Sequence, residues 1–245
     1  MKLSIVIPAY NESESLPETL TAIDQTLIAA RVDHEILVIN DNSKDGTLQV
    51  LEELSGTMPA LRYLTNEGPN GFGYAIRKGL ENFTGDCVAI VMADLSDSPA
   101  DLVRFYTTMV AGGWDCVFGS RFMRGSKVTD YPKYKMIVNR TANFIIRVLF
   151  RISYNDTTNA FKLYKRTTIE GLKPFLAPHF NLTVELPLKA IIRGYTYTVL
   201  PNSWTNRKYG VSNLKLREMG SRYFFILMYC LIEKYFSKGD FKKKW

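Results

Sequence analysis

Short apolar runs alternate with longer amphipathic stretches through the first half of the chain. The runs are rich in β-branched and aliphatic residues and end at Pro, Asn, Asp or Gly, which is typical of buried strands. They cover residues 3–8, 35–40, 61–64, 87–92 and 115–119. The stretches between them predict helices over residues 15–30, 47–54, 74–82 and 99–111. This alternation predicts an α/β fold with a mostly parallel sheet and helices on both faces.

The second half of the chain is less regular. Its pattern predicts helices over residues 134–152 and 183–194 and a strand over residues 195–200. The chain closes with an aromatic-rich run over residues 223–236 and a basic end, Lys242-Lys243-Lys244-Trp245. This basic C-terminal region is predicted to be helical.

The composition is that of a globular protein, with 46% hydrophobic and 22% charged residues in a chain of 245. It excludes a disordered or low-complexity chain. Charge is unevenly divided, because residues 1–118 carry 7 Lys and Arg against 17 Asp and Glu, whereas residues 119–245 carry 24 against 7. Such asymmetry indicates an anionic partner, either a membrane surface or nucleic acid. We find no helix-turn-helix, zinc or RNA-recognition signature, so we expect no nucleic-acid partner.

Cysteine usage and hydropathy bear on the compartment. Cys87, Cys116 and Cys230 lie in apolar runs without metal-ligand spacing, which predicts buried free thiols in a reducing cytosol. The two histidines exclude a histidine-rich metal site. No apolar run approaches the roughly 20 residues that a membrane-spanning helix needs, so we expect a cytoplasmic protein.

Polar motifs follow the predicted strands, where ligands bind in open α/β sheets. They cover residues 8–12, 40–47, 71–75, 92–99 and 119–121. Asp41 and Asp94 precede polar loops, and we expect their carboxylates to face one crevice and bind a base, a ribose or a divalent ion. Asp45 precedes Gly-Thr and a helix, so we expect it to cap that helix. For Asp97, capping and support of a metal both remain open.

Glycines and arginines supply the other candidate groups. The Gly71-x-Gly73 pair lacks the third glycine of a dinucleotide fingerprint and predicts a tight turn with close backbone approach. Arg121 directly follows a strand, and the loop at residues 207–212 combines charge, a ring, glycine and a hydroxyl. Both are candidates for anion binding, with a surface salt bridge or a plain solvated loop as the alternatives.

Three arginines on one helix face suggest either a membrane-binding surface or a solvated face. Arg140, Arg147 and Arg151 share one face of the predicted helix over residues 134–152. The stripe is consistent with a helix lying in a membrane interface and equally with a core helix that has a solvated face.

Taken in order, the motifs resemble those of glycosyltransferase family 2, and within it the polyprenol (dolichol) phosphate mannosyltransferases. The family pattern runs Pro-x-Tyr-Asn-Glu, Asp-Asp-Gly-Ser-x-Asp-Gly-Thr, Gly-Leu-Gly-x-Ala, Asp-Ala-Asp-Leu, Gly-Ser-Arg and Arg-x-x-Gly-x-Ser-Lys. The resemblance implies a Rossmann-like fold called GT-A over residues 1–215. Residues 216–245 then form a basic, aromatic-rich helix and tail for membrane-surface or oligomer contact.

The resemblance also implies roles for individual residues. Asp94, Arg121 and Arg207 would be catalytic, with Asp94 also the ligand of Mg²⁺ or Mn²⁺. The implied nucleotide-sugar-binding residues are Pro8, Tyr10, Glu12, Ile39, Asp41, Gly71, Gly73, Ala93, Ser96 and Ser212.

Three positions depart from the family pattern. Asn40 replaces an Asp, Asn213 replaces a Lys, and Met92 replaces the first Asp of Asp-x-Asp. A thioether is a poor ligand for Mg²⁺ or Mn²⁺, which prefer oxygen donors. Because Mg²⁺ is often held by one or two carboxylates plus substrate phosphates, Asp94 is still expected to hold it through a diphosphate.

The resemblance implies an inverting transfer of sugar from a nucleotide diphosphate sugar to a polyprenyl phosphate. No catalytic histidine is evident, and a lipid phosphate is already anionic, so this acceptor needs no general base. The alternatives are transfer to a saccharide hydroxyl in capsule or lipopolysaccharide synthesis, and a nucleotide-sugar binder that has lost catalysis. Guanosine with mannose, and uridine with glucose or an aminosugar, remain open as donors.

The expected partners follow from this acceptor. We expect the protein at the inner face of the membrane, held peripherally by its basic C-terminal third. A homodimer or a membrane subunit is the alternative partner for residues 223–236.

Overall fold

The computed structural model describes residues 1–207 and 216–243. Within these ranges, the main sheet has seven strands in the order β3-β2-β1-β4-β7-β5-β8. They are β1 (Leu3–Ala9), β2 (His34–Asn40), β3 (Leu61–Thr65), β4 (Cys87–Ile90), β5 (Cys116–Ser120), β7 (Lys162–Lys165) and β8 (Tyr197–Pro201). All neighbours pair in parallel except β7, which runs antiparallel to both β4 and β5. The predicted mostly parallel sheet is confirmed.

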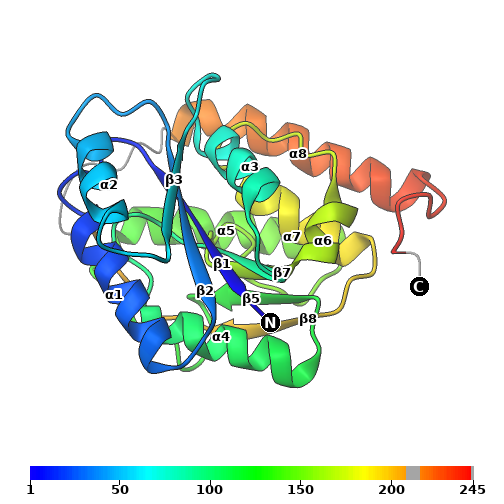
Figure 1. Cartoon of the computed structure of the whole chain (residues 1–245). Coiled ribbons are helices and arrows are strands. Elements are labelled where there is room, and N and C mark those ends of the chain that lie inside the picture. The colour runs from blue at the N-terminus through cyan, green and yellow to red at the C-terminus, as the bar shows by residue number, and fades with distance from the viewer. Residues whose placement is uncertain (208–215, 244–245) are drawn as a thin grey trace.

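Helices cover both faces of this sheet (Figure 1). They are α1 (Leu16–Ala29), α2 (Thr47–Ser55), α3 (Phe72–Asn82), α4 (Pro99–Gly112), α5 (Lys133–Phe150), α6 (Arg166–Leu172), α7 (Leu182–Ile192) and α8 (Leu216–Phe236). A small second sheet pairs β6 (Val128–Thr129) with β9 (Trp204–Thr205). The predicted alternation of the first half therefore holds, with shifts of at most two residues at the element ends.

The two faces of the sheet carry separate cores because successive side chains in a strand point to opposite sides. Val6 packs with side chains of α3, α5, α6, α7 and α8 on one face. Ile5 and Ile7 pack with side chains of α1, α2 and α4 on the other face. Central strands such as β1 and β2 are thus buried on both sides, which explains their nearly continuous apolar sequence.

The direction of β7 decides what reaches the functional edge of the sheet. We use "the carboxyl edge" for the side at which the parallel strands end, at Ala9, Asn40, Ile90 and Ser120. Because β7 is antiparallel, its first residue, Lys162, lies at this same edge. The segment before β7 is thereby brought beside the strand ends. The sequence pattern did not predict β7, which is only four residues long.

Helices α5 and α8 present apolar side chains to the solvent. On α5, Asn143, Ile146 and Phe150 are buried, while the opposite side is exposed. The exposed apolar residues of the two helices, which we name the α5–α8 apolar surface, are Tyr134, Ile137, Val138, Phe144, Ile145, Val148, Leu149, Phe224, Phe225, Met228, Ile232, Tyr235 and Phe236. The helices meet near their ends, where Tyr235 Oη donates to the carbonyl of Leu149 at 3.4 Å.

The outer side of α5 is therefore not an ordinary solvated face. Arg140, Arg147 and Arg151 are exposed there among apolar neighbours. Within the described ranges, no helix combines the length and the hydropathy required to cross a bilayer.

Candidate active site

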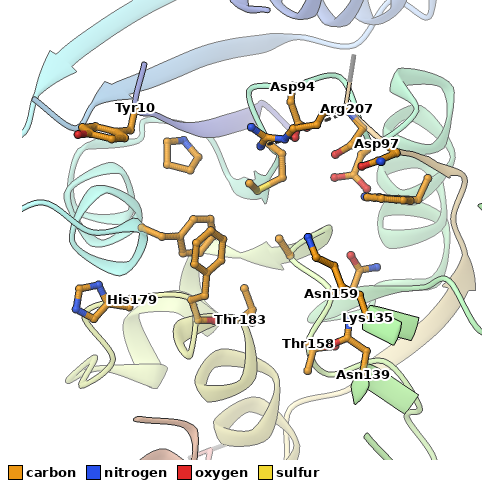
Figure 2. Close-up of a pocket in the computed structure, with 18 of the residues that line it drawn as sticks. Tyr10, Asp94, Asp97, Lys135, Asn139, Thr158, Asn159, His179, Thr183 and Arg207 are labelled. Carbon is orange, nitrogen blue, oxygen red and sulfur yellow. Dashed lines mark hydrogen bonds and ion pairs between the residues drawn. The ribbon is translucent and has the colours of Figure 1, made fainter. Parts of the chain in front are cut away.

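A cavity of about 760 Å³ opens at the carboxyl edge of the sheet. Its walls come from the ends of β1, β2 and β4, from the segment before β7, from Lys135 and Asn139 of α5, and from Arg222 and Tyr223 of α8 (Figure 2). Nine of the predicted site residues line it: Pro8, Tyr10, Glu12, Asp41, Gly71, Asp94, Ser96, Arg121 and Arg207. The structure thus brings together residues that are up to 199 positions apart in the sequence.

Four predicted residues are not placed on this wall. Ile39 and Ala93 are buried in the two cores of the sheet, so their side chains support the strand ends from below. Gly73 is buried in α3, where an added Cβ would lie 2.4 Å from the carbonyl oxygen of Ala177. Ser212 lies outside the described residues.

The glycine pair serves a close approach of backbone segments. An added Cβ on Gly71 would lie 2.7 Å from the carbonyl oxygen of Pro178 and from Nδ1 of His179. Contacts this short do not occur with a real side chain, so neither Gly71 nor Gly73 tolerates one without rearrangement. The predicted close backbone approach is confirmed, and it holds the start of α3 against residues 177–179.

Asp41 is fixed in the cavity wall by two donors. Its carboxylate accepts hydrogen bonds from Nδ2 of Asn66 and from the backbone N–H of Gly71, both at 2.7 Å. Asp41 is only 4% exposed. This bonding orients the carboxylate and leaves its remaining lone pairs as acceptors for a ligand.

Arg207 lies between two carboxylates. Its Nη2 is 2.7 Å from Oδ2 of Asp94, and its Nη1 is 3.5 Å from Oε1 of Glu12. Burial raises the pKa of Glu12, and the nearby Asp94 adds to this, while Ser15 and Arg207 oppose it. Asp94 also accepts the backbone N–H of Ser96 at 3.1 Å. The predicted catalytic pair Asp94 and Arg207 is therefore in direct contact.

Arg121 is held by a buried aspartate that the sequence pattern did not single out. Its Nε and Nη2 donate to the two oxygens of Asp156 at 2.9 and 2.8 Å, and its backbone N–H donates to the same carboxylate. Burial alone would lower the pKa of Arg121, but the Asp156 carboxylate more than offsets this and raises it. Asp156 is fully buried. Arg121 thus lines the cavity as a permanently charged, rigid group rather than as a mobile surface arginine.

Asp97 is the most unusual acid in the cavity. It is 4% exposed, and burial together with the nearby Asp94 raises its pKa to about 7. The capping role considered for it is not observed, because α4 begins after Ser98 without a side-chain cap. Asp45 is not the N-cap of α2 either, because that position is Gly46 and has no side-chain cap, but its carboxylate accepts the backbone N–H of Thr47, the first residue of the helix.

The segment before β7 forms the floor of the cavity. Thr158, Asn159 and Ala160 line it, and Lys162 lies below them, 2% exposed. The Nζ of Lys162 donates to the carbonyl oxygens of Thr157, Asn159 and Thr183, while burial lowers its pKa to about 7. This buried amine ties the floor to α7.

Two further residues in the cavity were missed by sequence reasoning. Lys135, in the first turn of α5, and His179, before α7, both line the wall (Figure 2). A histidine therefore lines the cavity, although the sequence offers no evident catalytic histidine. No local motif marks either residue, because each is brought in by the packing of a helix against the sheet.

The donor set of the cavity suits a hard divalent ion only in part. Carboxylates of Asp94 and Asp97 are oxygen donors of the type that Mg²⁺ and Mn²⁺ prefer. Met92 lines the same cavity with a thioether. Among the described residues, no group of three or more His, Cys, Asp or Glu side chains is arranged to hold a metal alone. The fit is to an ion that shares its ligands between the protein and a bound diphosphate.

Comparison with known proteins establishes the class. Residues 4–172 match the model of the family described as Glycosyl transferase family 2, and the chain belongs to this family. A dolichol-phosphate mannosyltransferase of Pyrococcus furiosus is 30% identical over 219 residues, which are 88% of this chain and 60% of that protein. A polyprenol monophosphomannose synthase of Mycolicibacterium smegmatis is 29% identical over 227 residues, or 86% of this chain and 80% of that protein.

Solved structures confirm the fold. Glucosyl-3-phosphoglycerate synthase of Mycobacterium tuberculosis, in complex with Mn²⁺ and UDP-glucose, superposes with a TM-score of 0.68 at 19% identity. The match covers 95% of this chain and 78% of that one. The chain therefore has the GT-A fold that the motifs predicted.

Proposed function

We propose that this protein transfers a sugar, with inversion, from a nucleotide diphosphate sugar to a polyprenyl phosphate. The observation that carries the proposal is the cavity itself, which joins two kinds of wall. One wall holds the carboxylates and arginines of the strand ends, and the other begins α5, whose outer side is apolar. A donor of the family's type and a lipid-borne anion would meet between them. The names of the two curated relatives support this acceptor.

Residues of this chain supply binding and charge for the displacement. An oxygen of the acceptor phosphate attacks the anomeric carbon while the bond from that carbon to the diphosphate oxygen breaks. The electron pair leaves with the nucleoside diphosphate, so negative charge grows on its oxygens. Arg207 and Arg121 stabilise this charge, and Asp156 keeps Arg121 charged and oriented. Pro8, Tyr10 and Asp41 hold the nucleoside side.

Mg²⁺ or Mn²⁺ is the proposed cofactor, held at Asp94. When bound, such an ion neutralises charge on the leaving diphosphate. A fold neighbour that is 19% identical was crystallised with Mn²⁺ and UDP-glucose, which supports the proposal.

Lys135 is the group that we propose for the acceptor phosphate. Within the described residues, no carboxylate lies within ion-pair distance of its amine, although Lys135 lines the cavity at half-buried depth. It is in the first turn of α5, where the helix dipole also favours an anion. The phosphate of an acceptor lipid bound beside α5 would reach Lys135, while its apolar chain would lie near the exposed apolar residues of the same helix.

We propose that the protein binds peripherally to the inner face of the membrane through the α5–α8 apolar surface. Exposed arginines flank the apolar residues of α5, and this combination favours an anionic bilayer surface. A second copy of the chain is the alternative occupant of this surface.

Transfer to a saccharide hydroxyl is the second candidate function. It requires a general base to remove the hydroxyl proton, and His179 and Asp97 are among the side chains of the cavity that could accept it. Identification of the product distinguishes this candidate from the lipid phosphate acceptor.

Donor binding is tested by thermal shift with GDP-mannose, UDP-glucose and UDP-N-acetylglucosamine, each with and without Mn²⁺. A ligand that binds only the folded chain raises the midpoint. We expect one donor to raise it more with Mn²⁺ present, and the increase to vanish in Asp94→Ala. If none of the three nucleotide sugars raises the midpoint of unfolding, none of them is the donor of this protein.

A further inference from the structure

The acids near Asp97 each have an arginine as an ion-pair partner, whereas Asp97 has none among the described residues. Asp94 pairs with Arg207, Asp156 pairs with Arg121, and Asp101 pairs with Arg104 at 2.7 Å. Asp97 lies near these three acids, and the charge of Arg121 only partly offsets their effect on its carboxylate. Within the described residues, it has no cation within ion-pair distance. A buried carboxylate without an ion-pair partner is costly, so a cation bound beside Asp97 would stabilise its charged form.

The hydrogen bonds of Asp97 are equally few. Its Oδ1 accepts from Nδ2 of Asn202 at 3.4 Å, a weak bond. Its Oδ2 has no donor among the residues that the structure describes, although the side chain is more than nine-tenths buried and lines the cavity. Figure 2 shows Asp97 and Asp94 together with Arg207 at one corner of the cavity.

The loop that carries both acids is firmly anchored. Ser96 donates its backbone N–H to Asp94 and accepts the backbone N–H of Thr205 at 2.9 Å. Asp97 itself pairs with Trp204 in an isolated β-bridge. The backbone that carries the two carboxylates is therefore fixed before any ligand arrives, which favours a preorganised metal site.

We propose that Asp97 is the second carboxylate ligand of the divalent ion, in place of the acid that position 92 lacks. The inference rests on the proposed function and deepens its metal site. Met92 offers only a sulfur atom, which Mg²⁺ and Mn²⁺ bind poorly. Asp94 and Asp97 together supply two oxygen ligands, and a bound diphosphate supplies others. The ion also provides the positive charge that Asp97 lacks.

The test measures Mn²⁺ binding in the presence of the nucleoside diphosphate of the donor that the protein binds. Binding is detected as a decrease in the electron paramagnetic resonance signal of free Mn²⁺. The variants are Asp97→Asn, Asp94→Asn, Met92→Asp and the double variant Met92→Asp with Asp97→Asn. Asp101→Asn is the matched control, because Asp101 is a neighbouring acid that already has its own arginine. Nucleotide binding without metal and the midpoint of thermal unfolding are recorded for each.

We expect Asp97→Asn to weaken Mn²⁺ binding by at least tenfold, since loss of an outer-shell partner alone costs roughly 10- to 100-fold. Met92→Asp should restore binding to the Asp97→Asn chain, and Asp101→Asn should bind as the wild type does. Unchanged Mn²⁺ affinity in Asp97→Asn would overturn the inference while leaving the proposed function intact. If the wild type binds nucleotide but no Mn²⁺, both the inference and the proposed cofactor are wrong.

Discussion

Nη2 of Arg207 lies 2.7 Å from Oδ2 of Asp94, so a protein cation occupies the carboxylate to which we assign the metal. The same guanidinium is 3.5 Å from Glu12. An incoming ion would compete with Arg207 for the negative charge of Asp94. Binding of a metal with its diphosphate would therefore release Arg207 from Asp94 and free it for the phosphates.

The first prediction concerns this competition. Arg207→Ala should raise the affinity for Mn²⁺ in the absence of nucleotide, because the competing cation is gone. The same variant should bind the donor more weakly, by about tenfold or more, because a charge-assisted contact to phosphate is lost. Isothermal titration of Mn²⁺ and of the donor, measured separately, checks both directions.

Arg62→Ala is the control for this experiment. Arg62 on β3 pairs with Glu35 on β2 and does not line the cavity. It should change neither affinity. If Arg207→Ala lowers or leaves unchanged the Mn²⁺ affinity, then Arg207 does not compete with the ion at Asp94.

The second prediction concerns the buried support of Arg121. Asp156→Asn leaves Arg121 without its carboxylate, and both side chains are nearly inaccessible to solvent. Breaking a buried ion pair from one side costs about 3–5 kcal/mol, so the free energy of unfolding should fall by that order. Urea denaturation measures it. A loss below about 1 kcal/mol would show that solvent or another group compensates Arg121.

The third prediction concerns the acceptor. Lys135→Ala should raise the KM for polyprenyl phosphate by about tenfold, in line with a hydrogen bond to a charged group, and leave the KM for the donor nearly unchanged. Lys133→Ala is the matched control, since Lys133 is exposed in the same turn of α5 and does not line the cavity. Equal effects of the two substitutions would assign the role to general surface charge.

The fourth prediction concerns the membrane. Ile137 and Phe144 on α5 are 64% and 63% exposed, and the double change Ile137→Ser with Phe144→Ser should strongly reduce sedimentation with anionic liposomes. Ile28→Ser on α1 removes a side chain that is 61% exposed on another element and should have no effect. If the double variant sediments like the wild type, this surface does not hold the protein on membranes.

Much of the fold follows from local pattern, because strands buried on both faces need nearly continuous apolar runs, and these runs end in polar turns. Asp41 and Asp94 could be expected in one crevice for the same reason. Asp156 could not, since it reaches Arg121 only through the antiparallel strand β7, which is too short to show a periodic signal.

The choice between a membrane-interface helix and a core helix with a solvated face for α5 also could not be made from the sequence. Sequence periodicity places Arg140 and Arg147 on one face but does not say whether the apolar residues beside them are buried. The exposure of Phe144 and Ile137 answers that question. Likewise, capping and metal support for Asp97 differ only in which groups surround its carboxylate, and these come from distant segments such as Asn202.

The central claim is the transfer of sugar to a lipid phosphate, and the most direct measurement is the fate of the sugar. The intact chain is incubated with the sugar-labelled donor that it binds, Mn²⁺ and vesicles containing polyprenyl phosphate. We expect label in the organic extract, bound to the lipid through an acid-labile glycosyl phosphate, and none with Asp94→Asn. Label found only in a saccharide, with the lipid phosphate unmodified, would contradict it.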